Sequence, residues 1–213
     1  MSRGKEAERA AHCGARRPGE AGAQANLESF ADEAPDYATG RNLPSIEGTS
    51  RLSPHLHFGE ISPATVWHRL TGSDEGTTTF LKELIWRDYA QNVIDQFPDY
   101  PRESYRDYDE RKLWRNPDAG HLIDADLECW QKGMTGYPIV DAGMRELWQT
   151  GWMHNRVRMI VASFLTKHLL IHWKKGEDWF WDTLVDADSA SNPSNWQWVA
   201  GSGADAAPYF RIF

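Results

Sequence analysis

The sequence predicts an all-α fold, and three observations lead to that expectation. From Leu27 onward, apolar residues recur at helical spacings, whereas runs that alternate apolar and polar residues are few. Pro63 and Pro138 each stand where a helix is expected to begin, and Gly151 stands where one is expected to end. The 213 residues, 40% hydrophobic and 25% charged, suffice for one sizeable core.

The apolar spacing of each segment sets the expected elements. Helices are expected at about residues 64–70, 80–96, 138–150, 154–170 and from about 177 to near 186. A loop through Asn192, Pro193 and Asn195 is expected after the last helix. The side chains expected to face the core are Leu81, Leu84, Ile85, Val93, Val140, Met144, Leu147, Trp148, Val157, Ile160, Val161, Phe164, Leu165, Phe180, Leu184 and Val185.

The amino-terminal segment differs in composition from the rest of the chain. Residues 1–26 are rich in Ala, Gly, Arg and Glu, and such a composition buries too little surface to offset the entropy of ordering. We therefore expect a disordered or non-native leader at 1–26 and one folded domain at 27–213. No apolar run is long enough to cross a membrane, and none follows the early basic residues as in a secretory signal. A cytoplasmic, monomeric protein is expected.

Charge and residue usage exclude several classes of protein. The formal net charge of -8 argues against indiscriminate nucleic-acid binding, so any DNA site must be a local basic patch. The only two cysteines, Cys13 and Cys129, cannot form a disulfide framework or ligate an iron–sulfur cluster. The histidines lack a third ligand at a recognised spacing, so no metal site is expected. The 11 tryptophans exceed what packing alone normally recruits, which suggests a second use for aromatic rings.

Two clusters of polar residues offer chemistry. Residues 48–54 combine hydroxyls, loop amides and one cation, as phosphate-binding loops do, although an ordinary turn before a helix has the same composition. Asp186 and Asp188 follow the expected helix at 177, where the helix dipole is already negative. Arg158 is the candidate partner that offsets them, and the alternative is a solvated pair of carboxylates.

Five sequence runs carry a resemblance to a known family. They are GTSRLS at 48–53, ELIWR at 83–87, TGYPIVD at 135–141, WMHNRVRM at 152–159 and DAD at 186–188. In this order they resemble the carboxy-terminal FAD-binding domain of the photolyase and cryptochrome family, and most of all class I cyclobutane pyrimidine dimer photolyases. The resemblance extends over residues 37–213 and implies a helical bundle. The family's amino-terminal antenna domain and its last segment are not part of the chain, so no antenna chromophore is expected.

The resemblance also implies a set of residues around a folded-back FAD. Its phosphates would meet Tyr37 and the 49–53 loop, Arg158 would pair with Asp186 beside the flavin, and Asn192 would face flavin N5. Plant-type cryptochromes carry Asp at the position of Asn192, which favours a repair enzyme. The implied cofactor-binding residues are Tyr37, Thr49, Ser50, Arg51, Leu52, Ser53, Arg158, Asp186, Ala187, Asp188 and Asn192.

Electron transfer and DNA binding are implied for further residues. Trp196, Trp173 and Trp114 match the inner, middle and outer members of the family's tryptophan relay, although another exposed aromatic could replace Trp114. Enzymes for (6-4) lesions carry His at the positions of Asn155 and Met159, so cyclobutane dimers are the expected substrate. The implied DNA-binding residues are Arg41, Glu83, Trp86, Arg87, Asn155, Arg156, Met159 and Trp198.

The implied function is light-driven repair of pyrimidine dimers in DNA by a lyase that uses reduced FAD. In that reaction Glu83 would hydrogen-bond the dimer, while Trp86 and Trp198 would border the pocket for the extruded lesion. Two alternatives stay open: a cryptochrome-like blue-light photoreceptor, and a helical remnant that binds neither flavin nor DNA.

Overall fold

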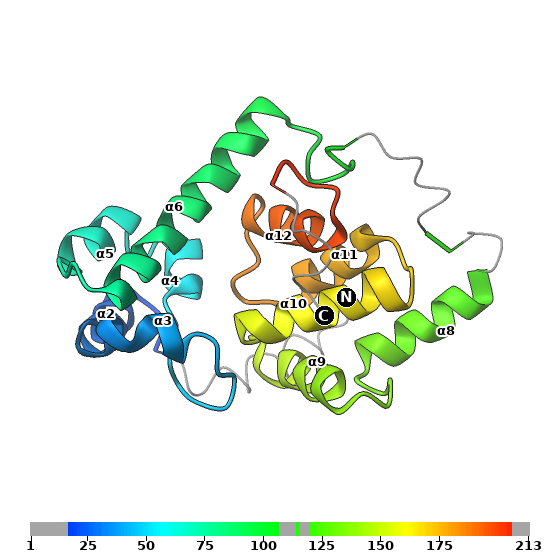
Figure 1. The fold of residues 1–213 in the computed structure, drawn as a ribbon, viewed down its shortest axis with the longest axis horizontal. Coiled ribbons are helices and arrows are strands. Elements are labelled where there is room, and N and C mark those ends of the chain that lie inside the picture. Colours follow the sequence, from blue (N-terminus) through cyan, green and yellow to red (C-terminus); the bar gives the residue numbers. More distant parts are fainter. Residues whose placement is uncertain (1–16, 107–113, 116–119, 206–213) are drawn as a thin grey trace. The chain divides into compact units, whose positions relative to one another are not determined.

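Helices make up all the regular structure of the described residues. The computed structural model describes residues 17–106, 114–115 and 120–205, and within these ranges every element is a helix (Figure 1), which confirms the predicted all-α class. The contacts divide the chain into two compact units, unit 1 (Met1–Tyr89) and unit 2 (Ala90–Phe213). Among the described residues, no helix is both long and apolar enough to pass through a bilayer.

Unit 1 is built from short helices around an aromatic core. Its elements are α2 (Glu20–Glu33), the 3-10 turn η1 (Ala34–Asp36), α3 (Tyr37–Gly40), α4 (Ser53–His57), α5 (Pro63–Arg69) and most of α6 (Glu75–Gln96), which continues into unit 2. The rings of Phe30 and Phe80 lie 4.5 Å apart, and Tyr37 meets both rings edge-on. The predicted start of α5 is confirmed, because Ser62 Oγ accepts the amide of Thr65 at 3.0 Å.

The predicted boundary of the leader is wrong for residues 20–26. Helix α2 begins at Glu20, and the side chains of Ala23 and Leu27 are fully buried in the core of unit 1. Ala23, Leu27 and Phe30 are spaced i, i+4 and i+7, which places them on one face of a helix. Within residues 20–26 this apolar face needs only Ala23, so the overall composition of the segment does not reveal it. Residues 1–16 of the expected leader lie outside the described residues.

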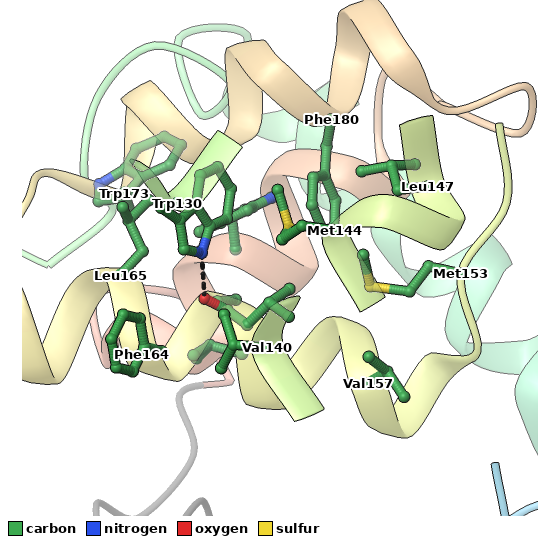
Figure 2. Close-up of a cluster of buried hydrophobic side chains, with 14 of the residues drawn as sticks. Trp130, Val140, Met144, Leu147, Met153, Val157, Phe164, Leu165, Trp173 and Phe180 are labelled. Carbon is green, nitrogen blue, oxygen red and sulfur yellow. Dashed lines mark hydrogen bonds between the residues drawn. The ribbon is translucent and has the colours of Figure 1, made fainter. Parts of the chain in front are cut away.

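Unit 2 holds the larger core. Its helices are α8 (Gly120–Gln131), α9 (Pro138–Thr150), α10 (Asn155–Ser163), the π-helix η3 (Phe164–His168), α11 (Trp173–Thr183) and α12 (Ser191–Ala200). Helices α9 and α10 pack together, as do α11 and α12. Figure 2 shows the buried cluster, in which the indole of Trp130 donates to the carbonyl oxygen of Val161 at 3.0 Å. This bond satisfies the one polar group of a fully buried side chain.

The start and end of α9 follow the sequence signals. Asp141 accepts hydrogen bonds from Thr135 N at 2.8 Å, Thr135 Oγ1 at 2.6 Å and Gly136 N at 3.0 Å, and so fixes the turn before the helix. Burial opposes ionisation of this carboxyl, but these donors outweigh burial and lower the pKa of Asp141. The helix ends at Gly151, which adopts the left-handed conformation with φ 66°.

Several details of the predicted helices are wrong. Ile85, Trp148 and Ile160 were expected in the core but are 54%, 50% and 38% exposed, because a period of 3.6 places the edge of a stripe at the surface. Trp148 stacks on Trp179 at 5.8 Å. Helix α11 begins at Trp173, not near 177, and residues 191–200 form helix α12 where a loop was expected.

Candidate functional site

The first part of the candidate site is a buried ion pair between α10 and the segment after α11. The carboxylate of Asp186 is 2% exposed, and its Oδ2 lies 2.9 Å from Nη2 of Arg158. Arg158 Nε also donates to the carbonyl oxygen of Met153 at 2.7 Å, so the guanidinium is held from two sides. The predicted pairing of Arg158 with Asp186 therefore exists, and the alternative of two solvated carboxylates is wrong.

Asp188 has a different structural role from the one expected. Its Oδ1 accepts the amides of Ala190 at 3.1 Å and Ser191 at 2.7 Å, at the amino-terminal end of α12. The sequence predicted that Asp188 lies at the negative, carboxy-terminal end of a helix, but α11 already ends at Thr183. Asp188 instead lies at the positive end of α12, which stabilises its charge and explains why residues 191–200 are helical.

Asn192 lies in a buried network that the sequence did not predict. Its Nδ2 donates to the backbone oxygen of Glu177 at 3.2 Å and to Glu177 Oε1 at 2.8 Å, while the second carboxylate oxygen of Glu177 pairs with Lys174. Burial raises the pKa of Glu177. Because the NH₂ group of Asn192 is engaged by Glu177, its carbonyl Oδ1 remains to accept a hydrogen bond from a donor, such as the N5–H of a reduced flavin.

The candidate phosphate loop, residues 49–53, belongs to unit 1 and is shaped by backbone conformation. Arg51 has φ 54°, in the left-handed region that residues with a side chain seldom adopt. Ser50 Oγ accepts the amide of Leu52 at 3.3 Å, and Leu52 is buried in the core, whereas Arg51 and Ser53 are exposed. A side chain at Gly48 would come 2.8 Å from the backbone of Gly40, so the loop starts pressed against α3. Of the five predicted loop residues, Thr49, Ser50, Arg51 and Leu52 form the irregular segment that leads into α4, and Ser53 is the first residue of that helix.

Three predicted residues of unit 1 are in direct contact. Arg41 forms an ion pair with Glu83, and its guanidinium carbon lies 5.3 Å from the centre of the Tyr37 ring. The contact links a predicted DNA contact, the predicted dimer-binding carboxylate and a predicted phosphate contact. Arg41 thereby offsets the negative charge of Glu83. A ligand that binds either side chain would have to replace this ion pair.

The remaining predicted DNA contacts are mostly accessible. Trp86 is 52% exposed, and its ring meets that of Tyr89 edge-on at 5.6 Å. Arg87 lies 3.5 Å from the Leu56 carbonyl oxygen. On unit 2, Asn155 is exposed, Trp198 is half-buried, and Arg156 Nη1 lies 3.3 Å from Met159 Sδ.

The three relay tryptophans all belong to unit 2. Trp196 and Trp173 are 2% and 0% exposed, while Trp114 is half-buried. A Cβ at Gly176 would lie 2.1 Å from Trp196 Cη2, so the inner ring packs on α11 one turn after Trp173. Trp173 Nε1 donates to Ser104 Oγ at 3.0 Å.

No metal centre is formed by the described part of the chain, where no cluster of three or more His, Cys, Asp or Glu side chains could hold an ion. Cys129 is a half-buried free thiol, and Cys13 lies outside the described residues. The polar groups that include the predicted flavin-binding side chains are the Arg158–Asp186 pair, Asp188 and the Asn192–Glu177–Lys174 network. An arrangement of one amide, one guanidinium and buried acids fits an organic cofactor with hydrogen-bonding ring edges.

Comparison with known proteins decides the family. A family model described as the FAD binding domain of DNA photolyase matches residues 80–213, which is more than half of the chain. The chain belongs to this family. A deoxyribodipyrimidine photo-lyase of Agrobacterium fabrum is 54% identical over 202 residues, which are 92% of this chain and 41% of that protein. The predicted membership of the photolyase and cryptochrome family is confirmed.

Solved structures of photolyases and cryptochromes share the fold. The crystal structure of a bacterial class III photolyase from Agrobacterium tumefaciens has a TM-score of 0.81 and 53% identity, over 92% of this chain and 41% of that one. A cryptochrome of Synechocystis has a TM-score of 0.79 and 35% identity, again over 92% and 41%. This photolyase-family chain thus spans about two fifths of the length of these relatives, and the narrower assignment to class I stays a prediction.

Sequence reasoning missed several residues of this FAD-binding domain that contact the predicted ones. Glu177 and Lys174 hold Asn192, Ser104 binds the indole of Trp173, and Gln91 lies 3.4 Å from Asp188. The i, i+3 spacing of Lys174 and Glu177 was a usable signal, because oppositely charged side chains at that spacing lie on one face of a helix. Ser104 and Gln91 gave no such signal, since their contacts join distant parts of the sequence.

Proposed function

We propose that this chain binds FAD and repairs cyclobutane pyrimidine dimers in DNA under blue light. The observation that carries the proposal is the set of polar side chains of Arg158, Asp186 and Asn192, whose guanidinium, carboxylate and amide groups match the hydrogen-bonding ring edges of a flavin. Family membership and relatives named deoxyribodipyrimidine photo-lyase support the same conclusion. Bound FAD in its reduced form would supply the electron that opens the dimer's cyclobutane ring and would recover it afterwards.

The residues of unit 2 would hold the flavin. Arg158 and Asp186 would lie beside the ring system, Ala187 and Asp188 would contact it through the segment between α11 and α12, and Asn192 would accept from flavin N5–H. A neutral amide at that position favours the reduced flavin that repair requires. The same position separates this chain from plant-type photoreceptors, which supports the repair function over the cryptochrome alternative.

The residues of unit 1 would hold the phosphates and the lesion. Tyr37 and the 49–53 loop offer hydroxyls, amides and the Arg51 cation to the pyrophosphate. Glu83 would exchange Arg41 for the base edges of the dimer, and the exposed face of Trp86 would stack on it. On unit 2, Asn155, Arg156, Met159 and Trp198 would contact DNA, while the half-buried Arg87 of α6 would contact a phosphate.

Further attributes follow from this function. We propose a monomeric, cytoplasmic protein in which Trp196, Trp173 and Trp114 carry electrons inward to restore the reduced flavin.

A repair assay tests this function. Oligonucleotides that contain one thymine dimer are illuminated with blue light in the presence of the FAD-loaded chain and a thiol reductant, and the thymines restored by repair are measured by the recovery of their ultraviolet absorbance. Light-dependent repair is expected, with loss of repair but retained FAD in Glu83→Ala and Trp86→Ala. Light-dependent binding of a protein partner without repair would support the photoreceptor, and a chain that takes up no FAD would support the inactive remnant.

A further inference from the structure

An imidazole lies between two of the proposed relay tryptophans. The ring of His172 is 5.2 Å from that of Trp114, measured between centroids, and 5.5 Å from that of Trp173, on which it is stacked with an interplanar angle of 30°. The three rings therefore form a continuous run of aromatic contacts from the partly buried Trp114 to the fully buried Trp173. Face and tilted contacts at such distances are attractive and hold rings in place.

Hydrogen bonds hold His172 and the residue next to Trp114 in place. His172 is the N-cap residue of α11, and its Nδ1 accepts the amide of Lys174 at 3.1 Å. On the other side, the amide of Arg115 donates to the carbonyl oxygen of Leu170 at 2.8 Å, and the Arg115 guanidinium pairs with Asp126 of α8. Trp114 is thereby held next to the segment that precedes α11.

The N-cap bond also fixes the orientation of the imidazole, because Nδ1 must point toward the Lys174 amide to accept its hydrogen bond. Within residues 17–106, 114–115 and 120–205, no hydrogen-bond partner reaches the buried Nε1 of Trp114, which leaves ring contacts to orient this indole.

We propose that His172 is a positioning residue of the electron relay, which stacks between Trp114 and Trp173 and makes Trp114 the outer member. This inference rests on the proposed function for the existence of the relay. The relay would move one electron at a time inward from Trp114 through Trp173 to Trp196, and bound FAD would supply the light-absorbing group that takes the electron up. An external thiol would then return one electron to Trp114, lose its proton and become a thiyl radical.

Two substitutions separate the stacking role of His172 from its role as a helix cap. His172→Asn keeps an N-cap side chain but removes the ring, whereas His172→Phe keeps a ring but removes the cap. An aromatic pair contributes about 0.5–1.5 kcal/mol, so the stacked arrangement of Trp114 becomes about 2- to 12-fold less populated without the imidazole. His168→Asn is the matched control, because it removes an imidazole that stacks on Phe164 at 5.7 Å, outside the relay.

The first readout needs no flavin. The chain is labelled with 5-fluorotryptophan, and the fluorine resonance of Trp114 is assigned from its absence in Trp114→Phe. The resonance is expected to move toward the position of a solvated indole in His172→Asn, and to keep a buried position in His172→Phe and His168→Asn. An unmoved resonance in His172→Asn overturns the positioning role.

The second readout is the rate of flavin photoreduction by a thiol in the FAD-loaded chain. The rate is expected to fall about 2- to 12-fold in His172→Asn, in proportion to the stacked population, and to stay near that of the unsubstituted chain in His172→Phe. Slowing in His172→Phe without slowing in His172→Asn would mean that only the helix cap matters and overturns the proposal. If Trp114→Phe does not slow photoreduction, the relay of the proposed function is wrong at its outer member, and the fluorine resonance still decides whether His172 positions Trp114.

Discussion

The residues of unit 2 that we propose face the flavin and the proposed phosphate loop of unit 1 differ in how far protein contacts alone fix them. Asp186, Asp188 and Asn192 are all buried, and each is held by at least one named hydrogen bond or ion pair. In the 49–53 loop only Leu52 is buried, and Arg51 is held in a strained backbone conformation with its side chain exposed.

This difference shows two ways to prepare a binding site. Buried polar groups in unit 2 must be satisfied for the unit to fold, so their substitution is expected to cost stability and binding together. In the loop, the surrounding structure holds Arg51 in a strained backbone conformation. A substitution that relieves this strain is expected to raise the free energy of unfolding while it lowers the affinity for FAD. The predictions below test this contrast, from the largest expected effect to the smallest.

Removal of the Arg158 guanidinium is expected to have the largest effect. Arg158→Ala leaves the Asp186 carboxylate, 2% exposed, without its cation, which typically costs about 3–5 kcal/mol for a buried pair. Urea unfolding of the flavin-free chain measures the loss. The control is Arg102→Ala, which breaks a pair with side chains 78% and 73% exposed and should cost less than about 1 kcal/mol. Equal costs for the two variants would contradict the buried pair.

Removal of the Asp188 carboxylate comes next. Asp188→Ala deprives the amides of Ala190 and Ser191, at the start of α12, of their side-chain acceptor, and the loss of such an acceptor at a helix N-terminus costs about 0.5–2 kcal/mol. The same substitution at the N-cap Ser62 of α5 should cost a similar amount. FAD affinity, measured by fluorescence titration, should fall in Asp188→Ala alone. A fall of similar size in Ser62→Ala would show that affinity follows overall stability and not the site.

Relief of the loop strain is expected to separate stability from binding. Arg51→Gly removes the cost of a left-handed side-chain residue but adds backbone entropy to the unfolded chain, so stability should rise by up to about 1 kcal/mol. FAD affinity should fall about tenfold or more, because a charge-assisted contact to phosphate is lost. The matched control is Leu170→Gly, at the other left-handed position with φ 53°, where stability should change in the same direction without any change in affinity.

Two buried carboxyls of unit 2 should respond to pH in opposite ways. The pKa of Asp141 is lowered on folding, so its contribution is complete above its unfolded pKa and is lost as pH falls toward the folded one. Burial raises the pKa of Glu177, so the folded chain binds that proton more tightly and stability falls as pH rises through the raised pKa. Urea unfolding at several pH values between about 3 and 8 measures both effects.

The variants Asp141→Asn and Glu177→Gln isolate these contributions. The stability difference between the unsubstituted chain and Asp141→Asn should shrink as pH falls. Glu177→Gln should gain stability relative to the unsubstituted chain as pH rises. The same slope in both comparisons would contradict the opposite shifts.

The sequence predicted the all-α class and the family, because helical periodicity and five ordered motifs are local features of the chain. The resemblance also implied the Arg158–Asp186 pair, whereas the residue types alone left a solvated pair of carboxylates open. The sequence pattern failed for α12, where the acidic pair suggested the end of a helix although Asp188 caps the start of the next one. It also missed Glu177 as the partner of Asn192, because the two residues lie 15 positions apart and only tertiary packing brings them together.

Titration of the flavin-free chain with FAD tests the central claim most directly. We predict that the folded chain binds FAD, turns yellow and quenches flavin fluorescence, and that Arg158→Ala loses this binding while Ser62→Ala retains it. Circular dichroism confirms that each protein is helical before the titration. A helical, unsubstituted chain that stays colourless in excess FAD would contradict the claim that Arg158, Asp186 and Asn192 form a flavin site.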